Sequence, residues 1–294
     1  MDENETDRRK DDMTTIRDTE FGGERPLYAS SGLRLEGVTI HEGESALKES
    51  SDIEAAHCRF EGRYPFWCCS GARISGCSFT EESRAPLWYS SDIRLEDCLV
   101  LAPKILRELD RTEISGCSFP KAVETLWDCR GVTLRDCSFK GADYLFLRSS
   151  DILARGLSLK GKYTFQYCRN VEIHDSELDT KDAFWEAENV TIYDSEVKGE
   201  YLGWYSRGLK LVRCHICGTQ PLCYARDLVL EDCTFGPDAD LAFEYSSVHA
   251  RILSSVASVK NPLTGRISAP SYGEIILDEN IKAPADCEIL TESL

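Results

Sequence analysis

A short block of residues recurs along the chain at nearly constant intervals, and no other feature of the sequence constrains the fold as strongly. RISGCSF at 73–79 and EISGCSF at 113–119 differ at one position, and LVLEDCTF at 228–235 is a third variant. Stacked repeats of this length bury a core that a single repeat cannot bury, so the chain is predicted to be a solenoid. One column of small or apolar residues runs through twelve blocks, 19 to 21 residues apart: Val38, Cys58, Cys77, Cys98, Cys117, Cys137, Leu157, Ser176, Ser195, Cys214, Cys233 and Leu253.

Each block is predicted to form short strands separated by bends. Block 228–235 places apolar residues at its first, third, sixth and eighth positions, and a spacing of two gives a strand one buried face. The three-residue step in the middle changes parity, so the chain bends there. Glycine or aspartate, which tolerate tight bends, precede the Cys column at these positions: Gly37, Gly76, Asp97, Gly116, Asp136, Gly156, Asp175, Asp194 and Asp232.

A third apolar segment follows in each block, as in YPFWCCS, APLWYSS and ETLWDCR, and it predicts a third strand per coil. Coils that lie over one another at the roughly 4.8 Å spacing of paired strands form a parallel β-helix. The left-handed form repeats every six residues, and this chain shows no such period. The predicted fold is therefore all-β, a right-handed parallel β-helix of about twelve coils of 19–21 residues.

The chain is predicted to be one domain with different ends. Residues 1–19 are highly charged and are predicted to be a disordered tail. The β-helix is predicted over 20–258. The register blurs beyond it, so 259–294 is expected to form irregular strands and a cap of the same domain.

The fourteen cysteines are predicted to be free thiols rather than disulfides or metal ligands. Ser176 and Ser195 replace cysteine in the buried column, and neither a disulfide nor a metal site survives that change. CHIC at 214–217 has no second pair to complete a zinc site. No metal and no cofactor are predicted. The N-terminal residues lack the apolar core of a secretory signal, so a cytoplasmic location is expected.

The charge balance excludes some partners. Lys and Arg total 34 against 51 Asp and Glu, which gives a net charge of −17. Such a surface repels nucleic acid and anionic membranes. No stretch approaches the roughly 20 apolar residues of a spanning helix.

Several longer sequence segments carry a family resemblance: FGGERPLY, ESALKES, ETLWDC, KDAFWEAENVTIYDSEVKGEYLGW and LAFEYS. With these segments the chain, from residue 20 to about 275, resembles an uncharacterised bacterial family of pectin-lyase-like right-handed β-helix proteins, catalogued as a domain of unknown function. The resemblance implies the fold. It brings no established reaction and no catalytic residues.

All five tryptophans fall in one column, directly after the apolar residue of the third segment. By strand alternation they are predicted to point outward, where aromatic rings can stack on sugars. The alternative is that chain termini or a partner chain, such as a second copy in a homo-oligomer, covers them. The predicted ligand-binding residues are Trp67, Trp88, Arg107, Trp127, Trp185 and Trp204.

Charged residues flank this column and leave two hypotheses open. The first is a binding or scaffold protein that recognises an oligosaccharide or glycoconjugate along the tryptophans. The second is a carbohydrate-active lyase or hydrolase, because glycoside hydrolysis needs two carboxylates about 5–10 Å apart and a lyase needs a base. Whether the protein is an enzyme stays open. The candidate catalytic residues are Lys181, Asp182, Glu200 and Glu244.

Overall fold

The computed structural model describes residues 13–279, 281 and 286–292, and it is built from strands, turns and bends. Two compact units divide the chain, Met1–Ser138 and Phe139–Leu294. Each is a parallel β-helix, which confirms the predicted fold class, and the described residues contain about 14 turns where about twelve were predicted. None of these residues forms a helix of the length and apolarity that crossing a membrane requires.

The strands are short and follow the repeat. In the first unit they are β1 (Thr14–Arg17), β2 (Glu20–Glu24), β3 (Ser31–Glu36), β4 (Thr39–Glu44), β5 (Ser51–Ala56), β6 (Arg59–Phe60), β7 (Ser70–Ser75), β8 (Ser78–Phe79), β9 (Ser91–Glu96), β10 (Leu99–Val100), β11 (Asp110–Ser115), β12 (Ser118–Phe119) and β13 (Arg130–Arg135). From the unit boundary onward they are β14 (Ser138–Lys140), β15 (Ser150–Arg155), β16 (Ser158–Lys162), β17 (Arg169–His174), β18 (Glu177–Lys181), β19 (Glu188–Tyr193), β20 (Glu196–Lys198), β21 (Arg207–Val212), β22 (His215–Cys217), β23 (Leu228–Phe235), β24 (Ser247–Ile252), β25 (Val256–Lys260), β26 (Thr264–Ala269), β27 (Tyr272–Ile276) and β28 (Asp286–Thr291).

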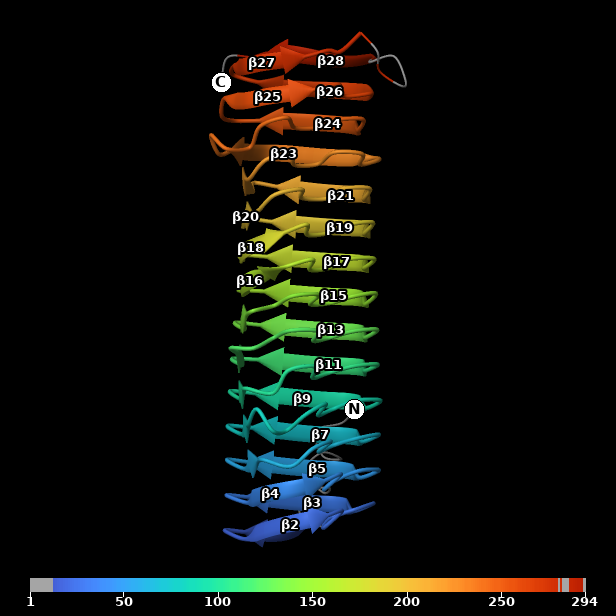
Figure 1. The fold of residues 1–294 in the computed structure, drawn as a ribbon, viewed down its shortest axis with the longest axis vertical. Helices are drawn as coiled ribbons and strands as arrows, with labels where there is room; N and C mark the ends of the chain where they lie inside the picture. The colour runs from blue at the N-terminus through green and yellow to red at the C-terminus, as the bar shows by residue number, and fades with distance from the viewer. Residues whose placement is uncertain (1–12, 280, 282–285, 293–294) are drawn as a thin grey trace, which may run out of the picture. The chain divides into compact units, whose positions relative to one another are not determined.

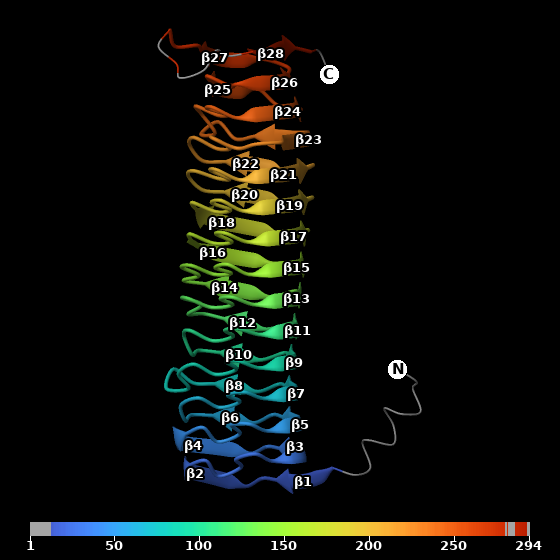
Figure 2. The same ribbon diagram turned by 90° about the vertical axis from the view of Figure 1, so that its right-hand side faces the viewer.

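Two sheets in each unit keep the register that the repeat predicts. In the first unit β3, β5, β7, β9 and β11 lie side by side in one parallel sheet, and β4, β6, β8 and β10 form a second (Figures 1 and 2). Ile53 pairs with Leu33 on one side and with Ala72 on the other, so like positions stack. In the second unit β15, β17, β19 and β21 repeat the arrangement, with β16, β18, β20 and β22 in the second sheet.

The bends between the two sheets form as predicted. Gly37, Gly76 and Asp97 have φ angles of 62°, 58° and 51°, in the left-handed region that glycine and aspartate tolerate best. Two bulkier residues share the column, because His57 and Arg213 both have a φ of 53°. The geometry of the coil therefore fixes this conformation whichever side chain stands there.

The third segment of each coil is a series of tight turns, so the predicted third strand is wrong. Tyr163, Phe165 and Tyr167 have φ angles of 59°, 55° and 58°, and this alternation of left-handed residues prevents an extended strand. The N–H of Cys168 donates to the carbonyl of Phe165 at 3.4 Å, with Tyr167 at the third position, as type II turns require. Hydrogen bonds between coils persist, since the N–H of Tyr167 donates to the carbonyl of Trp185 at 2.9 Å.

The core consists of stacked like residues. Phe146, Phe165 and Phe184 are fully buried, with ring centroids 4.8 and 4.9 Å apart and interplanar angles of 13° and 12°. Burial of each such ring contributes about 1.5–3 kcal/mol, which offsets the about 1–2 kcal/mol cost of a left-handed φ at a residue with a side chain. The cysteines of the predicted column are also buried, and all fourteen cysteines of the chain are free.

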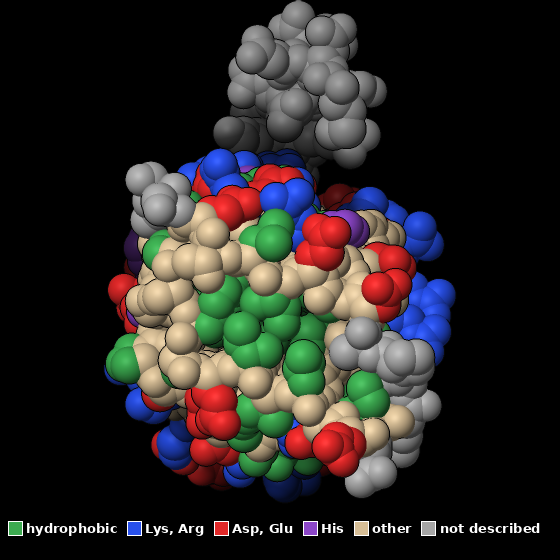
Figure 3. Space-filling model, turned by 90° about the horizontal axis from the view of Figure 1, so that it is seen from above, with side chains coloured by type: hydrophobic (Ala, Val, Ile, Leu, Met, Phe, Trp, Pro, Cys, Tyr) green, Lys and Arg blue, Asp and Glu red, His purple; other side chains and the backbone are tan. Residues whose placement is uncertain are grey.

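Parallel strand pairing extends toward both ends of the described residues. Thr14–Arg17 is a strand paired with β3, so the β-helix begins before residue 20, and residues 1–12 of the predicted tail lie outside the described residues. After residue 258, β26 and β28 continue the sheet of β24 in parallel register, so this part is regular. Figure 3 shows the end of the second unit that carries β26 and β28. Apolar side chains gather at its centre and charged side chains at its rim.

Candidate functional site

The five tryptophans lie half-buried on the turn segments, on the outer side of the residue that enters the core. Trp67 and Trp88 stack with centroids 5.4 Å apart and planes at 26°. In the second unit, Trp185 and Trp204 stack at 5.7 Å and 28°. Each of these indoles therefore gives one face to its neighbour and stays partly open to solvent.

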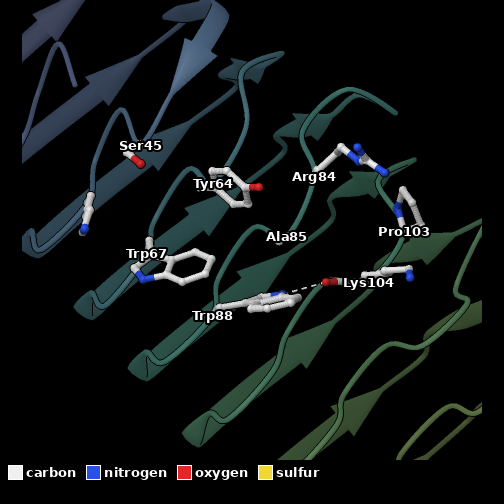
Figure 4. Close-up of a pocket in the computed structure, with 9 residues that line it drawn as sticks. Ser45, Tyr64, Trp67, Arg84, Ala85, Trp88, Pro103 and Lys104 are labelled. Carbon is white, nitrogen blue, oxygen red and sulfur yellow. Dashed lines mark hydrogen bonds between the residues drawn. The ribbon is translucent and has the colours of Figure 1, made fainter. Parts of the chain in front are cut away.

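Hydrogen bonds fix two of these rings. The indole N–H of Trp88 donates to the carbonyl oxygen of Lys104 at 2.7 Å (Figure 4). The indole N–H of Trp204 makes the same contact with the carbonyl of Gln220 at 2.8 Å. Because both bonds reach the next coil, these rings lie across the coil boundary in one orientation.

Arg107 lies between two aromatic rings. Its guanidinium carbon is 4.7 Å from the centroid of Trp88 and 4.0 Å from that of Trp127, and it forms an ion pair with Glu124 at 2.7 Å. The Arg107 side chain is only 16% exposed. The structure thus gives Arg107 a positioning role, because its guanidinium packs between the rings of Trp88 and Trp127 and holds Trp88 in place.

A set of exposed and half-buried tyrosines extends the aromatic surface, and the sequence reasoning missed it. Tyr205 is 47% exposed and stacks on Tyr224 at 4.9 Å and 18°, and Tyr224 stacks on Tyr245 at 5.6 Å. Trp204 lies against Tyr205 and Tyr224, with centroids 6.2 and 5.1 Å away. Tyr224 and Tyr245 stand two residues after a buried Leu or Phe, and Tyr89 and Tyr167, which are 44% and 46% exposed, repeat this spacing. Tyr205 has the same place in its coil but follows Gly203.

A hollow of about 980 Å³ lies beside these tyrosines in the second unit. Acidic and basic side chains both line it, so it can accept and donate hydrogen bonds. Its lining includes Glu186, Glu188, Tyr205, Arg207, Tyr224, Arg226 and Tyr245.

A second hollow, of about 550 Å³, lies in the first unit (Figure 4). Four consecutive turn segments contribute to it. Trp67 and Ser45 lie on one side, and Arg84, Pro103 and Lys104 on the other (Figure 4). Its full lining is Ser45, Lys48, Tyr64, Trp67, Arg84, Ala85, Trp88, Pro103 and Lys104, and we call it the basic pocket.

The structure brings three of the four candidate catalytic residues together. The Nζ of Lys181 lies 2.8 Å from a carboxylate oxygen of Glu200, and the N–H of Asp182 donates to the carbonyl of Glu200 at 2.8 Å. Burial raises the pKa of Asp182, which is 7% exposed, and Glu200 raises it further while Lys181 lowers it. Glu244 lies apart from them, in an ion pair with Lys260 at 3.0 Å.

The arrangement offers aromatic faces and charged groups rather than a metal centre. Within the described residues no three His, Cys, Asp or Glu side chains are grouped so that they could hold a metal ion. The aromatic and charged groups of this surface can bind a ligand by stacking and hydrogen bonding. Together, the fold and this surface define a parallel β-helix protein with aromatic residues along its turn segments.

Comparison with known proteins places the chain in a family. A family described as "Protein of unknown function (DUF3737)" matches residues 14–290, and the chain belongs to it. No curated protein sequence matches. The resemblance to an uncharacterised β-helix family is thereby confirmed.

Solved structures are similar to the chain at low sequence identity. PfbA, a surface adhesin of Streptococcus pneumoniae, matches with a TM-score of 0.53 and 9% identity, covering 92% of this chain and 86% of its own. The A-module of the mannuronan C-5 epimerase AlgE4 from Azotobacter vinelandii matches with a TM-score of 0.38 and 9% identity, covering 96% and 91%. A tailspike protein mutant of E. coli bacteriophage HK620, solved with a pentasaccharide, has a TM-score of 0.43 and 10% identity over 90% and 72%.

Proposed function

We propose that the protein binds carbohydrate, as an oligosaccharide or glycoconjugate, on the aromatic side of the turn segments. One observation carries the proposal: Trp204, Tyr205, Tyr224 and Tyr245 form a continuous aromatic surface over successive coils, and it borders a hollow of about 980 Å³. Sugar rings have apolar faces that stack on aromatic rings and hydroxyl groups that need polar partners at the edge.

The polar partners lie beside the rings. Arg207 and Arg226 can donate to hydroxyl oxygens, and Glu186 and Glu188 can accept from hydroxyl groups. The spacing of the coils also suits a chain ligand, because each coil repeats the same groups at a regular step. The aromatic rings are already oriented by stacking, so binding would order few side chains.

Fluorescence titration tests this proposal. Addition of an oligosaccharide that binds should change the emission of the tryptophans, and a glycan array would supply the ligands to titrate. Replacement of Tyr205 by Ala should weaken binding by about fivefold, since stacking of this kind contributes on the order of 1 kcal/mol. Tyr167→Ala is the matched control, because Tyr167 is exposed at the same position of another coil, 46% against 47%, outside this hollow.

A second candidate function, a carbohydrate-cleaving enzyme, is supported by Asp182. A carboxyl group with a raised pKa can act as a general acid, and the neighbouring Glu200 carboxylate could serve as the second group of a hydrolase. The Glu200 carboxylate lies 2.8 Å from the Nζ of Lys181. Assays for new reducing ends and for unsaturated products on every bound glycan test this function. Loss of turnover in both Asp182→Asn and Glu200→Gln would support it.

We also propose a cytoplasmic location, which the cysteines support. All fourteen are free, and adjacent coils place many of them in the same buried column. Such thiols persist in a reducing compartment. Fractionation of the native host, with the protein detected by antibody, tests this location.

A further inference from the structure

We propose that the basic pocket binds the carboxylate of an acidic sugar, so that the protein prefers glycans that carry a uronic acid residue. The proposal rests on carbohydrate binding and specifies its ligand class. It is carried by the first unit alone, through the turn segments that contain Ser45, Tyr64, Arg84 and Lys104.

The charge of the pocket opposes that of the whole chain. Its nine lining residues include Lys48, Arg84 and Lys104 but no acid, in a protein of net charge −17. Lys48 and Lys104 have carboxylate neighbours, Glu49 at 3.7 Å and Glu124 at 3.1 Å. Arg84 forms no ion pair with any described residue, so its guanidinium is free to bind a carboxylate through two hydrogen bonds.

Several neutral donors in the pocket also lack partners. Ser45 is 8% exposed, lines the pocket, and its hydroxyl makes no hydrogen bond within the described part of the chain. The same holds for the indole N–H of Trp67, in contrast to that of Trp88, which Lys104 satisfies. The Ser45 hydroxyl and the Trp67 indole N–H are therefore two unpaired donors at the pocket wall that a ligand oxygen can accept from.

A small residue creates the hollow. In the turn segments, the hydrogen-bonding ladder aligns Ala85 with Tyr64 of the preceding coil and Lys104 of the next. Ala85 is 7% exposed and has the left-handed φ, 50°, that larger residues adopt in this column. The missing side chain leaves open space beside Trp67, Trp88 and Lys104, and the Arg84 side chain extends along this hollow toward Pro103 (Figure 4).

The ligand fits one acidic group rather than a polyanion. A volume of about 550 Å³ is within the range of small-ligand pockets, and one unpaired arginine matches one carboxylate. The surrounding acidic surface repels further negative charges. A neutral sugar ring can stack on Trp67 while its neighbour places a carboxylate against Arg84 and the two lysines.

Titration of two matched trisaccharides tests the proposal. One ends in glucuronic acid and the other in glucose at the same position, and we expect the acidic ligand to bind at least tenfold more tightly at low salt. The preference should shrink as sodium chloride screens the charges. Arg84→Gln should remove the preference and leave the affinity for the neutral trisaccharide unchanged. Arg63→Gln is the control, because Arg63 has the aligned position one coil earlier, outside the pocket.

A second variant fills the pocket without changing the backbone. Ala85→Tyr should fold, because Tyr64 and Tyr144 have the same φ in this column, and it should abolish the preference for the acidic ligand. Gln220→Tyr is the matched control, because Gln220 has the aligned position in the second unit and a φ of 50°. This variant should keep the preference for the acidic ligand.

Each other result has a defined meaning. Equal affinity for both trisaccharides, or an equal loss in Arg63→Gln and Arg84→Gln, would overturn the acidic-sugar assignment while carbohydrate binding stands. Tighter binding of glucose 6-phosphate or glucose 6-sulfate than of glucuronic acid would overturn the choice of carboxylate. Absence of binding by any sugar, neutral or acidic, would instead overturn the proposed function.

Discussion

The backbone N–H of Cys58 donates a hydrogen bond to the Sγ of Cys77, one coil further along, at 3.2 Å. Cys98 and Cys117 repeat the contact at 3.3 Å. In the second unit the hydroxyl of Ser176 accepts the same bond from the N–H of Leu157 at 3.0 Å. At these positions the side chain is small and accepts a hydrogen bond from the backbone of the preceding coil, which explains why serine can replace cysteine in the column.

Substitution of Cys77 should separate this requirement from simple burial. Cys77→Ser should lower the free energy of unfolding by less than about 1 kcal/mol, because the hydroxyl replaces the thiol as acceptor. Cys77→Ala leaves the N–H of Cys58 unsatisfied and should cost about 1–3 kcal/mol. Denaturant unfolding measures both. Equal losses in the two variants would contradict the role of the hydrogen bond.

Thiol reactivity should distinguish one cysteine from the others. Cys68 is exposed, whereas burial raises the pKa of Cys69 and of Cys129 to about 12. With a disulfide reagent at pH 8, we expect one thiol to react rapidly in the native protein and all fourteen after unfolding. Cys68→Ser should remove the rapid phase. Rapid reaction of several thiols in that variant would show that the columns are accessible.

Glycine should stabilise a bend that now holds histidine. His57 is exposed with a φ of 53°, and glycine adopts this conformation without the steric cost of a Cβ. His57→Gly should raise the free energy of unfolding by about 0.5–1 kcal/mol, measured by denaturant titration. Gly76→Ala, at the equivalent bend with a φ of 58°, should lower it. Lower stability of His57→Gly would refute the argument from backbone strain.

The first coils should respond to pH through His41. Hydrogen bonds from the His41 ring to the carboxylates of Glu61, at 2.9 Å, and Glu20, at 3.2 Å, raise the pKa of His41. A raised pKa in the folded state means that this contribution to stability is full below about pH 6.5 and is lost as the pH rises through the folded pKa. Amide exchange of β2, corrected for intrinsic rates, should be slower at pH 6 than at pH 8. His41→Gln should remove the difference, and its persistence would assign the effect to another group.

Asp182 should destabilise the fold when it is ionised. Its pKa is raised, mainly by burial, so its charged form is the costly one, and the cost disappears as the pH falls through the raised pKa. Asp182→Asn should therefore raise the unfolding free energy at pH 8 by on the order of 1 kcal/mol and have less effect at pH 4. Asp179→Asn is the control, because Asp179 pairs with Lys160 at 3.1 Å. A loss of stability in Asp182→Asn at pH 8 would contradict this sign.

The sequence predicted the repeat, the register and the bends because these depend on residue type at fixed spacing. Gly37 and Asp97 mark bends by their chemistry. The turn segments could not be predicted in the same way. Phe165 and Tyr167 favour strands by residue type, yet they adopt left-handed φ angles because stacking on the neighbouring coils outweighs the local preference.

The candidate site was predicted in part, for a similar reason. The tryptophan column was visible in the sequence, but the half-burial of Trp88 and the bond from its N–H to Lys104 depend on the turn geometry. The basic pocket exists because the side chain of Ala85 is small, whereas most coils have a larger residue at this position. A comparison of column members by size, rather than by polarity, would have identified it.

The constant register has a consequence for how such a chain changes length. Leu157 and Ser176 occupy equivalent positions in adjacent coils, 19 residues apart. Deletion of 158–176 would join two equivalent points, and every remaining strand would meet a partner of the same kind as before. Gain or loss of one whole coil is therefore a small evolutionary step, whereas an insertion of a few residues inside a coil displaces all the columns at once.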